Sequence, residues 1–500
     1  KGTIWDGFVS GSQAAQLTCT ANNVVVKNIE FQNGLRAVSI TGDDAKVSGC
    51  KFRSCADGVW VDGARARVQS NDFYNLQGSD FTIEIYGPDA SVTKNKMVNN
   101  YYAGIYIDAE GGGTAKVMQN VMDSCQDYMT IDVNNAGAPK IKKNKIMYGY
   151  LDGKVINASN CDDAEICGNK LMTINYDVTD GIHVTGERAV IDKNVIDTLN
   201  DYDSSLSAIY VSGNDAIITR NKLRGCNAGA DTDTFGVGVN GNGALVEKNS
   251  MSDMGGGGEA TYGVEVVGNN CSVNKNKMGR FNDEYTYGIF CTGNGAEVKQ
   301  NRFSNFLDGY VVGVIGDDFM IMNNSFKGCA YNSASIGTTG NATGGGTARI
   351  ESNTMNSIAY DAIDHDGDGV WIRYNKMKYI GGTACTATGN NNTLHQNNVT
   401  DCLFDAFLIE GDGNNINKCV ATRAGKDGFD IDGAGNAFNE CKATDCVAEG
   451  FDNSVGSTGT IATACTFKKS RLDYCGNGNM ANDAGTVYGT GGPGQAPEID

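Results

Sequence analysis

Apolar residues recur along the chain in a short frame, apolar-x-x-Asn-x-apolar, which is first complete in VQSNDF around Asn71. From Ile29, which opens the series, to Cys465, which closes it, there are 18 steps of about 24 residues each. Cys takes the Asn slot at Cys50, Cys419, Cys441 and Cys465. Asn fills the slot at fourteen successive steps: Asn71, Asn95, Asn120, Asn144, Asn169, Asn194, Asn221, Asn249, Asn276, Asn301, Asn324, Asn353, Asn375 and Asn397. A repeat of this length is typical of a solenoid.

A second pattern lies between these marks, in segments such as DGVWVDG (57–63), DGIHVTG (180–186) and DGFDIDG (427–433). Apolar and other residues alternate there over five positions, which predicts a β-strand with one buried face. No helical period of useful length accompanies them. Each repeat is therefore predicted to hold three short strands, separated by Gly and Asn turns.

These repeats and the Asn series resemble the right-handed parallel β-helix of the pectate lyase-like superfamily. The resemblance implies an all-β solenoid of about 19 coils, in which the Asn side chains of neighbouring coils bond to each other as an asparagine ladder. It predicts a single β-helix domain over residues 1–475 and a Gly-rich C-terminal tail over residues 476–500.

The alternation also predicts which side chains point outward. An N-terminal group of outward positions mixes aromatic rings with acids, as expected of a surface that stacks on sugar rings: Trp60, Asp62, Glu84, Tyr86, Tyr106 and Asp108. Further along, the pattern places Thr130 beside Tyr106 and Asp132 beside Asp108, and it leaves the register near Lys154 open. The alternative is that exposed strand positions simply favour aromatic residues.

A C-terminal group of acids predicts a calcium site, because stacked carboxylates repel each other unless a cation lies between them. Residues 364–369, DHDGDG, resemble the start of a D-x-D-x-D-G calcium loop, although Asn375 stands where that loop has Glu. The alternative is a solvated acidic face. The predicted calcium ligands are Asp364, Asp366, Asp368, Asp430 and Asp432.

The resemblance also implies that lyase, hydrolase or epimerase activity on polysaccharides has to be considered. The chain lacks the His-Gly and Asn-Thr-Asp motifs of polygalacturonase-like enzymes, and GFDID (428–432) keeps only one residue of the epimerase motif Asp-Pro-His-Glu. His183 is the one His at an outward strand position, with Tyr210 and Asp132 nearby as catalytic candidates. The incomplete motifs favour a protein that is not an enzyme, while a lone His is more often structural.

The composition limits the classes of binding partner that the protein can have. The formal charge is −19, from 59 acidic and 40 basic residues, which argues against nucleic acid and anionic membranes as partners. No apolar run approaches the roughly 18 residues of a membrane span. Most of the 17 Cys fall at apolar positions and are expected to be buried thiols. Cys419, Cys441 and Cys465 share one slot and are close enough for one disulfide.

The two ends show no amphipathic helix that would cap a β-helix, and open coils are templates for pairing. Trp5 and Phe8 are therefore expected to contact another copy, with the coil near 24–31 meeting the region of 465–475. These observations favour a secreted, self-associating structural protein of an extracellular or cell-surface assembly. The alternatives are a calcium-dependent polysaccharide lyase or epimerase, and a glycan-binding phage or surface fibre.

Overall fold

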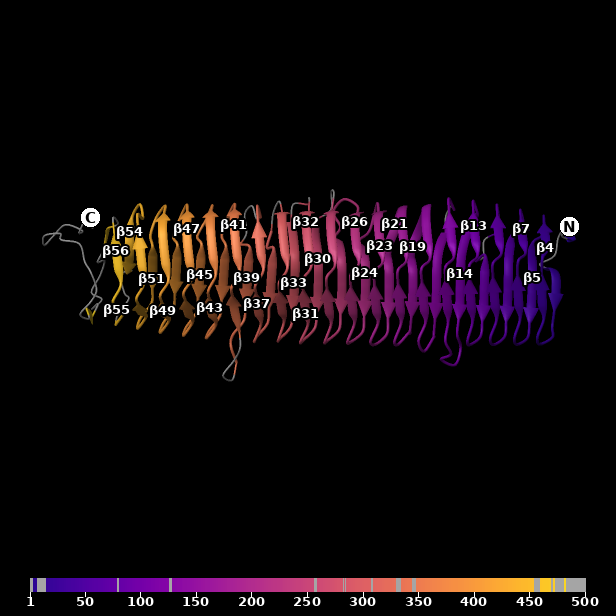
Figure 1. Cartoon of the computed structure of the whole chain (residues 1–500), viewed down its shortest axis with the longest axis horizontal. Coiled ribbons are helices and arrows are strands. Elements are labelled where there is room, and N and C mark those ends of the chain that lie inside the picture. The colour runs from indigo at the N-terminus through magenta and orange to yellow at the C-terminus, as the bar shows by residue number, and fades with distance from the viewer. Residues whose placement is uncertain are drawn as a thin grey trace. The chain divides into compact units, whose positions relative to one another are not determined.

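The computed structural model describes residues 3–6, 15–78, 81–125, 128–255, 259–281, 283, 285–306, 309–329, 334–343, 348–453, 459–468, 471–472 and 481–482. These residues form parallel β-strands and no helix (Figure 1). The fold is the predicted right-handed parallel β-helix, with about 17 turns instead of the predicted 19. The outermost repeats give only short strands, such as β57 (Arg471–Leu472) and β58 (Ala481–Asn482). The chain divides into unit 1 (1–261) and unit 2 (262–500).

Each coil of unit 1 contains three strands in a fixed order, as in β13 (Lys96–Val98), β14 (Tyr102–Asp108) and β15 (Lys116–Met118). We call them the ladder strand, the face strand and the short strand. Each pairs in parallel with its counterpart in the next coil. The face strands of unit 1 are β2 (Ala15–Cys19), β5 (Arg36–Thr41), β8 (Asp57–Asp62), β11 (Ile83–Tyr86), β14, β17 (Tyr128–Asn134), β24 (Leu206–Ser212) and β27 (Thr234–Asn240), together with the second halves of β19 (Lys145–Ser159) and β21 (Lys170–Thr185).

The core of unit 1 is made of aligned columns, because parallel pairing in register places like positions of successive coils above one another. Val59, Ile83 and Ile105 follow one another along one inward column and are fully buried or nearly so. In the ladder strands, Phe31, Phe52 and Phe73 form a stack with ring centroids 5.3 and 4.5 Å apart. The alternation of the sequence thus decides which side chains enter the core.

The buried Asn series runs through unit 1 from Asn71 to Asn249. From Asn71 to Asn221, each Nδ2 donates to the Oδ1 of the Asn in the next coil at 3.0–3.1 Å. The second Nδ2 hydrogen goes to a backbone carbonyl of the preceding coil, as from Asn221 to Ile191 at 2.9 Å. The Oδ1 atom also accepts a backbone N–H, as from Asn194 to Asn221 at 2.9 Å. Every buried amide of this series therefore has partners on both sides.

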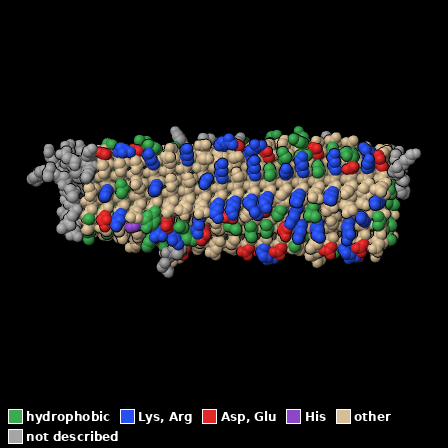
Figure 2. Space-filling model, in the orientation of Figure 1, with side chains coloured by type: hydrophobic (Ala, Val, Ile, Leu, Met, Phe, Trp, Pro, Cys, Tyr) green, Lys and Arg blue, Asp and Glu red, His purple; other side chains and the backbone are tan. Residues whose placement is uncertain are grey.

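Basic residues gather beside this series. The two residues that flank each ladder residue of unit 1, from Gly49 to Ser250, include one acid, Asp72, and ten exposed Lys or Arg. Rows of Lys and Arg are visible on the face that Figure 2 shows. The net negative charge is therefore unevenly spread over unit 1. The ten residues are Lys51, Lys94, Lys96, Lys143, Lys145, Lys170, Lys193, Arg220, Lys222 and Lys248.

Unit 2 repeats the same coil. Its face strands are β33 (Tyr285–Thr292), β36 (Val312–Ile315), β39 (Ile336–Thr339), β42 (Ile363–Asp366), β45 (Cys385–Thr388), β48 (Phe407–Glu410), β51 (Phe429–Asp432) and β54 (Glu449–Asn453). Its Asn series runs from Asn276 to Asn397, with amide bonds of 3.0–3.1 Å. A second buried Asn series, Asn392, Asn414 and Asn436, accepts backbone N–H groups at another corner at 2.7–2.8 Å.

The Cys residues that the structure describes are free thiols, and nearly all are buried. Cys419, Cys441 and Cys465 are among them, so the structure contains no disulfide in that slot. Burial raises the pKa of the Cys125 thiol to about 11, as expected of a thiol that acts as a small apolar side chain. Within the described residues no helix is long and apolar enough to cross a membrane.

The predicted contacts of the chain ends fall outside the described residues. Phe8, Cys475 and the side chain of Trp5 belong to the part of the chain that is not described. Self-association through the ends stays a prediction, as does the division into a domain over 1–475 and a tail.

The Asn series generates a stability prediction. Replacing Asn221 by Ala removes the acceptor of the Asn194 amide and backbone N–H, both of which are buried. An unsatisfied buried group costs roughly 1–3 kcal/mol, so we expect a clear fall in the free energy of unfolding. Asn240→Ala, at an exposed position of β27, is the matched control and should change the unfolding midpoint little. Equal effects of the two substitutions in denaturant titrations would contradict the structural role of the series.

Candidate functional site

The outward side chains of the unit 1 face strands lie in two columns. The first contains Trp60, Glu84, Tyr106, Asp132, Asn157, His183 and Tyr210. The second contains Asp62, Tyr86, Asp108 and Asn134. The predicted register was therefore wrong by two residues at β17, since Asp132 pairs with Tyr106 and Thr130 does not. The irregularity near Lys154 is a register shift between Gly153 and Lys154, after which Asn157 pairs with His183.

The six predicted glycan-contacting residues come together as a checkerboard. Along each strand and across each strand pair, an acid is next to an aromatic ring: Trp60 beside Asp62 and Glu84, Tyr86 beside Glu84 and Asp108, and Tyr106 beside Asp108. Carboxylates directly opposite each other on a sheet repel, so this alternation lets the face carry acids without paired like charges. We call Trp60, Asp62, Glu84, Tyr86, Tyr106 and Asp108 the checkerboard face.

Three rings form a continuous zigzag along this face, because Trp60 and Tyr106 lie in the first column and Tyr86 lies in the second. The centroids of Trp60 and Tyr86 are 6.1 Å apart, and those of Tyr86 and Tyr106 are 5.5 Å apart. All three rings are partly exposed, whereas Glu84 between them is only 8 % exposed. Burial and the nearby Asp108 raise the pKa of Tyr106, so its hydroxyl stays protonated and can donate a hydrogen bond. The face thus offers apolar ring surfaces flanked by acceptors and a donor.

Of the three predicted catalytic residues, His183 and Tyr210 are neighbours, whereas Asp132 lies farther away. The His183 and Tyr210 rings stack with centroids 5.2 Å apart. His183 Nδ1 lies 3.0 Å from the Asp180 carboxylate, a partner that the sequence prediction missed although it lies three residues away. Asp132 is separated from His183 by Asn157, a gap of two strand spacings or about 10 Å. Burial raises the pKa of Asp132, while Asn157 donates to it at 2.8 Å.

The predicted calcium ligands of unit 2 lie in separate places. Asp364 and Asp366 point outward from β42, and Asp430 and Asp432 occupy the matching positions of β51. Three strand spacings, about 14 Å, separate the two pairs, so they do not share one ion. Asp368 lies past the Gly367 turn, where its carboxylate accepts the Asn390 backbone N–H at 2.6 Å. The prediction of one site with all five acids was wrong, while calcium binding by fewer of them stays a prediction.

A lysine occupies the tightest acid group in the described part of unit 2. Carboxylate oxygens of Asp405, Asp427 and Asp430 lie within 4.8 Å of one another. Lys426 Nζ lies 3.1, 3.4 and 3.0 Å from them. Burial and Glu449 raise the pKa of Asp427 to about 6, whereas these carboxylates raise the pKa of Lys426 and keep it charged. The ammonium group therefore provides the positive charge that the sequence analysis assigned to calcium at Asp430.

His365, which follows Asp364, points into the core. It is fully buried, and its ring nitrogens contact the Thr338 hydroxyl at 2.8 Å and the Gly367 carbonyl at 3.2 Å. Burial lowers its pKa to about 4, so the ring is neutral at physiological pH. This His has a structural role inside the coil.

Comparison with known proteins identifies the family. A family model described as a right-handed beta helix region matches residues 7–146, 36–176 and 310–467. These matches cover more than half of the chain, so the chain belongs to this family. No curated protein sequence matches the chain.

Among solved structures, the chain is similar to the Siphovirus 9NA tailspike receptor binding domain, at 12% identity and a TM-score of 0.34, over 78% of this chain and 79% of that one. It is also similar to the PL6 family alginate lyase AlyGC (11% identity, TM-score 0.24, 97% and 96% covered). A third is PfbA, a surface adhesin of Streptococcus pneumoniae (8% identity, TM-score 0.16, 85% and 84% covered). At TM-scores below 0.5 these similarities carry no functional argument for this chain.

The lysine-filled acid group generates a prediction. Lys426→Met removes the ammonium and leaves three carboxylates facing one another, so the melting temperature should fall. The loss should be smaller than the roughly 3–5 kcal/mol known for fully buried pairs, because Lys426 is 48% exposed. Calcium should restore part of the loss in the variant by taking the ammonium's place.

Arg423→Met provides the control, because Arg423 pairs with one exposed acid, Asp401, and its loss creates no three-carboxylate group. Calcium titrations followed by thermal unfolding compare the two variants with the unchanged protein. Calcium stabilisation of the unchanged protein that equals that of Lys426→Met would show that the lysine does not occupy a cation site.

Proposed function

We propose that this is an extracellular or cell-surface β-helix protein that binds a polysaccharide along the checkerboard face of unit 1, without chemical turnover. The zigzag row of Trp60, Tyr86 and Tyr106 is the observation that carries the proposal. It spans three successive coils, so it matches a linear polymer whose sugar rings lie one after another along the face. Binding sites for small ligands typically combine ring surfaces with a few placed polar groups.

The chemistry of the face supports a sugar ligand. Flat aromatic rings stack on the C–H face of a sugar, and the carboxylates of Asp62 and Asp108 accept hydrogen bonds from sugar hydroxyls. Asp108 Oδ1 already accepts from Asn135 at 3.0 Å, which fixes the orientation of that carboxylate. Strand pairing fixes the backbone that carries the rings, so binding costs little conformational entropy.

We propose an extracellular or cell-surface location because the proposed ligand is a polysaccharide that lies outside the cell. We also propose that the protein associates with copies of itself into a filament, sheath or layer. This association would repeat the checkerboard face along an assembly, and several weak contacts to one polymer would then act together.

Binding to a panel of immobilised polysaccharides tests the proposal. A double substitution Trp60→Ala and Tyr86→Ala removes two stacking rings, each worth about 0.5–1.5 kcal/mol. We therefore expect the affinity to fall by roughly 5- to 150-fold, with the melting temperature nearly unchanged. Tyr202→Ala, which removes a 62% exposed ring of unit 1 away from the face, is the control and should bind normally. Equal binding by the double variant would remove the proposal.

A second candidate is proton abstraction from a sugar by His183, as in a polysaccharide lyase or epimerase. One observation favours it: Asp180 accepts from Nδ1–H of His183 at 3.0 Å, an arrangement that leaves Nε2 free to take a proton. The activity would rest on the same column of the face that carries Tyr106.

Turnover assays on uronate-containing polysaccharides test this candidate. They follow the ultraviolet absorbance of the double bond that a lyase creates, and the exchange of the sugar C5 proton for solvent deuterium that an epimerase causes. If the candidate holds, the unchanged protein forms product and His183→Ala forms at least 100-fold less, in line with the 10²–10⁴-fold effect of a general base. Tyr202→Ala should retain full activity. No product from the unchanged protein on any uronate polymer would leave binding without turnover as the better account.

A further inference from the structure

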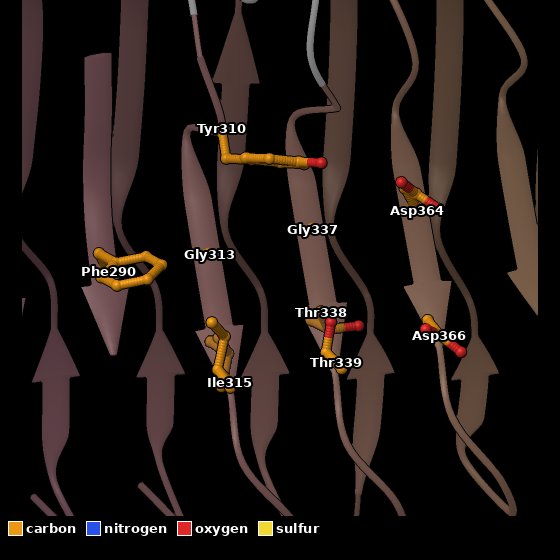
Figure 3. Close-up of a pocket in the computed structure, with 10 residues that line it drawn as sticks. Phe290, Tyr310, Gly313, Ile315, Gly337, Thr338, Thr339, Asp364 and Asp366 are labelled. Carbon is orange, nitrogen blue, oxygen red and sulfur yellow. The ribbon is translucent and has the colours of Figure 1, made fainter. Parts of the chain in front are cut away.

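A groove crosses the face of unit 2 between β33 and β42 (Figure 3). Its volume is about 270 Å³, just below the roughly 300–1,000 Å³ of drug-sized ligand sites, and it suits one ring-sized group. Phe290 stands on one side, Asp364 and Asp366 stand on the other, and Tyr310 reaches over from above. The groove contains none of the checkerboard residues.

Two glycines let the aromatic rings lie close to the backbone, and Ile315 and Thr339 line the groove beside them (Figure 3). Gly313 and Gly337 occupy outward positions between Phe290 and Asp364 in the same column. A Cβ on Gly313 would lie 2.8 Å from Phe290 Cδ2, and one on Gly337 would lie 2.4 Å from two carbons of the Tyr310 ring. Any side chain here would therefore push the rings aside. The two glycines therefore allow the Phe290 and Tyr310 rings to take the positions that bound the groove.

The aromatic side of the groove continues along the face. Tyr262 and Tyr287 stack with centroids 4.8 Å apart, and Tyr287 and Tyr310 stack at 6.4 Å. Phe290 lies 5.4 Å from Tyr287. The groove thus opens onto a row of rings, which provides adjacent positions for further units of a polymer.

On the opposite side of the groove, the negative charges of Asp364 and Asp366 have no basic partner among the described residues. Neither Asp364 nor Asp366 forms an ion pair within the described residues, although Asp401 has Arg423 and Asp430 has Lys426. Burial raises the pKa of Asp364, and Asp366 and Glu410 raise it further by repulsion. Burial raises the pKa of Tyr310, and the negative charge of Asp364 raises it further. Asp364 is half-buried and Asp366 is exposed, and their carboxylates repel each other, so an external cation would stabilise them.

We propose that this groove binds a protonated amino sugar of a polysaccharide. The sugar ring lies against the Phe290 and Tyr310 rings, and its ammonium group lies between Asp364 and Asp366. Cations are attracted to aromatic faces as well as to carboxylates, so both sides of the groove favour the same ligand. A metal ion would make no use of the rings, and a neutral sugar could donate hydroxyl hydrogen bonds but would leave the two negative charges uncompensated. The proposal goes beyond the checkerboard face, because it concerns unit 2 and specifies the ligand's charge.

Calorimetry of the full chain tests the proposal with two oligomers of equal length, β-1,4-linked glucosamine and its fully N-acetylated form. We expect the amine oligomer to bind at least tenfold more tightly at low salt, and the preference to shrink at high salt. Asp366→Asn should remove most of the preference. Asp432→Asn is the matched control, since Asp432 is an equally exposed acid at the same outward position of β51. Gly337→Ala should weaken binding of both oligomers by moving Tyr310.

Several outcomes would overturn the proposal. Equal binding of the two oligomers, or an unchanged preference in Asp366→Asn, would exclude an ammonium site. Tighter binding of oligo-lysine than of the amine oligomer, lost in Asp366→Asn, would indicate a basic protein segment as the ligand. Calcium binding that depends on Asp366, with no amine preference, would indicate a metal site. Trp60→Ala, which tests the checkerboard face, should leave the amine preference of unit 2 intact, so the two proposals fail separately.

Discussion

The stacking of coils in exact register by buried amides is the constraint on which the rest of this structure depends. An Asn side chain buried in an apolar core must use both amide hydrogens and its oxygen, or lose stability. In each unit the Asn of one coil satisfies the Asn of the next, and this is possible only when the coils are aligned. A slip of any coil would break bonds on both sides of it. The aligned coils then place every outward residue above its counterpart.

Alignment creates an electrostatic problem for an acidic protein, because like residues in successive coils become neighbours. The structure contains three solutions. Arginines bridge to acids of the preceding coil, as Arg188 does to Asp163 at 2.7 Å. Aromatic rings separate acids on the checkerboard face. Lys426 neutralises three carboxylates in unit 2. Asp364 and Asp366 have none of these, and they lie beside an open groove.

The amino-acid sequence predicts most of the fold and only part of the candidate site. A period of two fixes which face a residue occupies, so Trp60, Tyr86 and Asp132 were correctly expected to point outward. It does not exclude a slip of two residues, which preserves the face, and Asp132 was misplaced for that reason. Lys426 was missed because its partner Asp405 belongs to the preceding coil. Asp368 was misassigned because the calcium-loop pattern treats as one loop what is here a strand followed by a Gly turn.

A crystal structure of the chain with a polysaccharide fragment that it binds tests the central claim most directly, namely that the aligned face of unit 1 is the glycan-binding surface. The account predicts successive sugar rings over Trp60, Tyr86 and Tyr106, with hydroxyls within hydrogen-bond distance of Asp62 or Asp108. Sugar density at another place on unit 1, with these three rings still exposed to solvent, would contradict it.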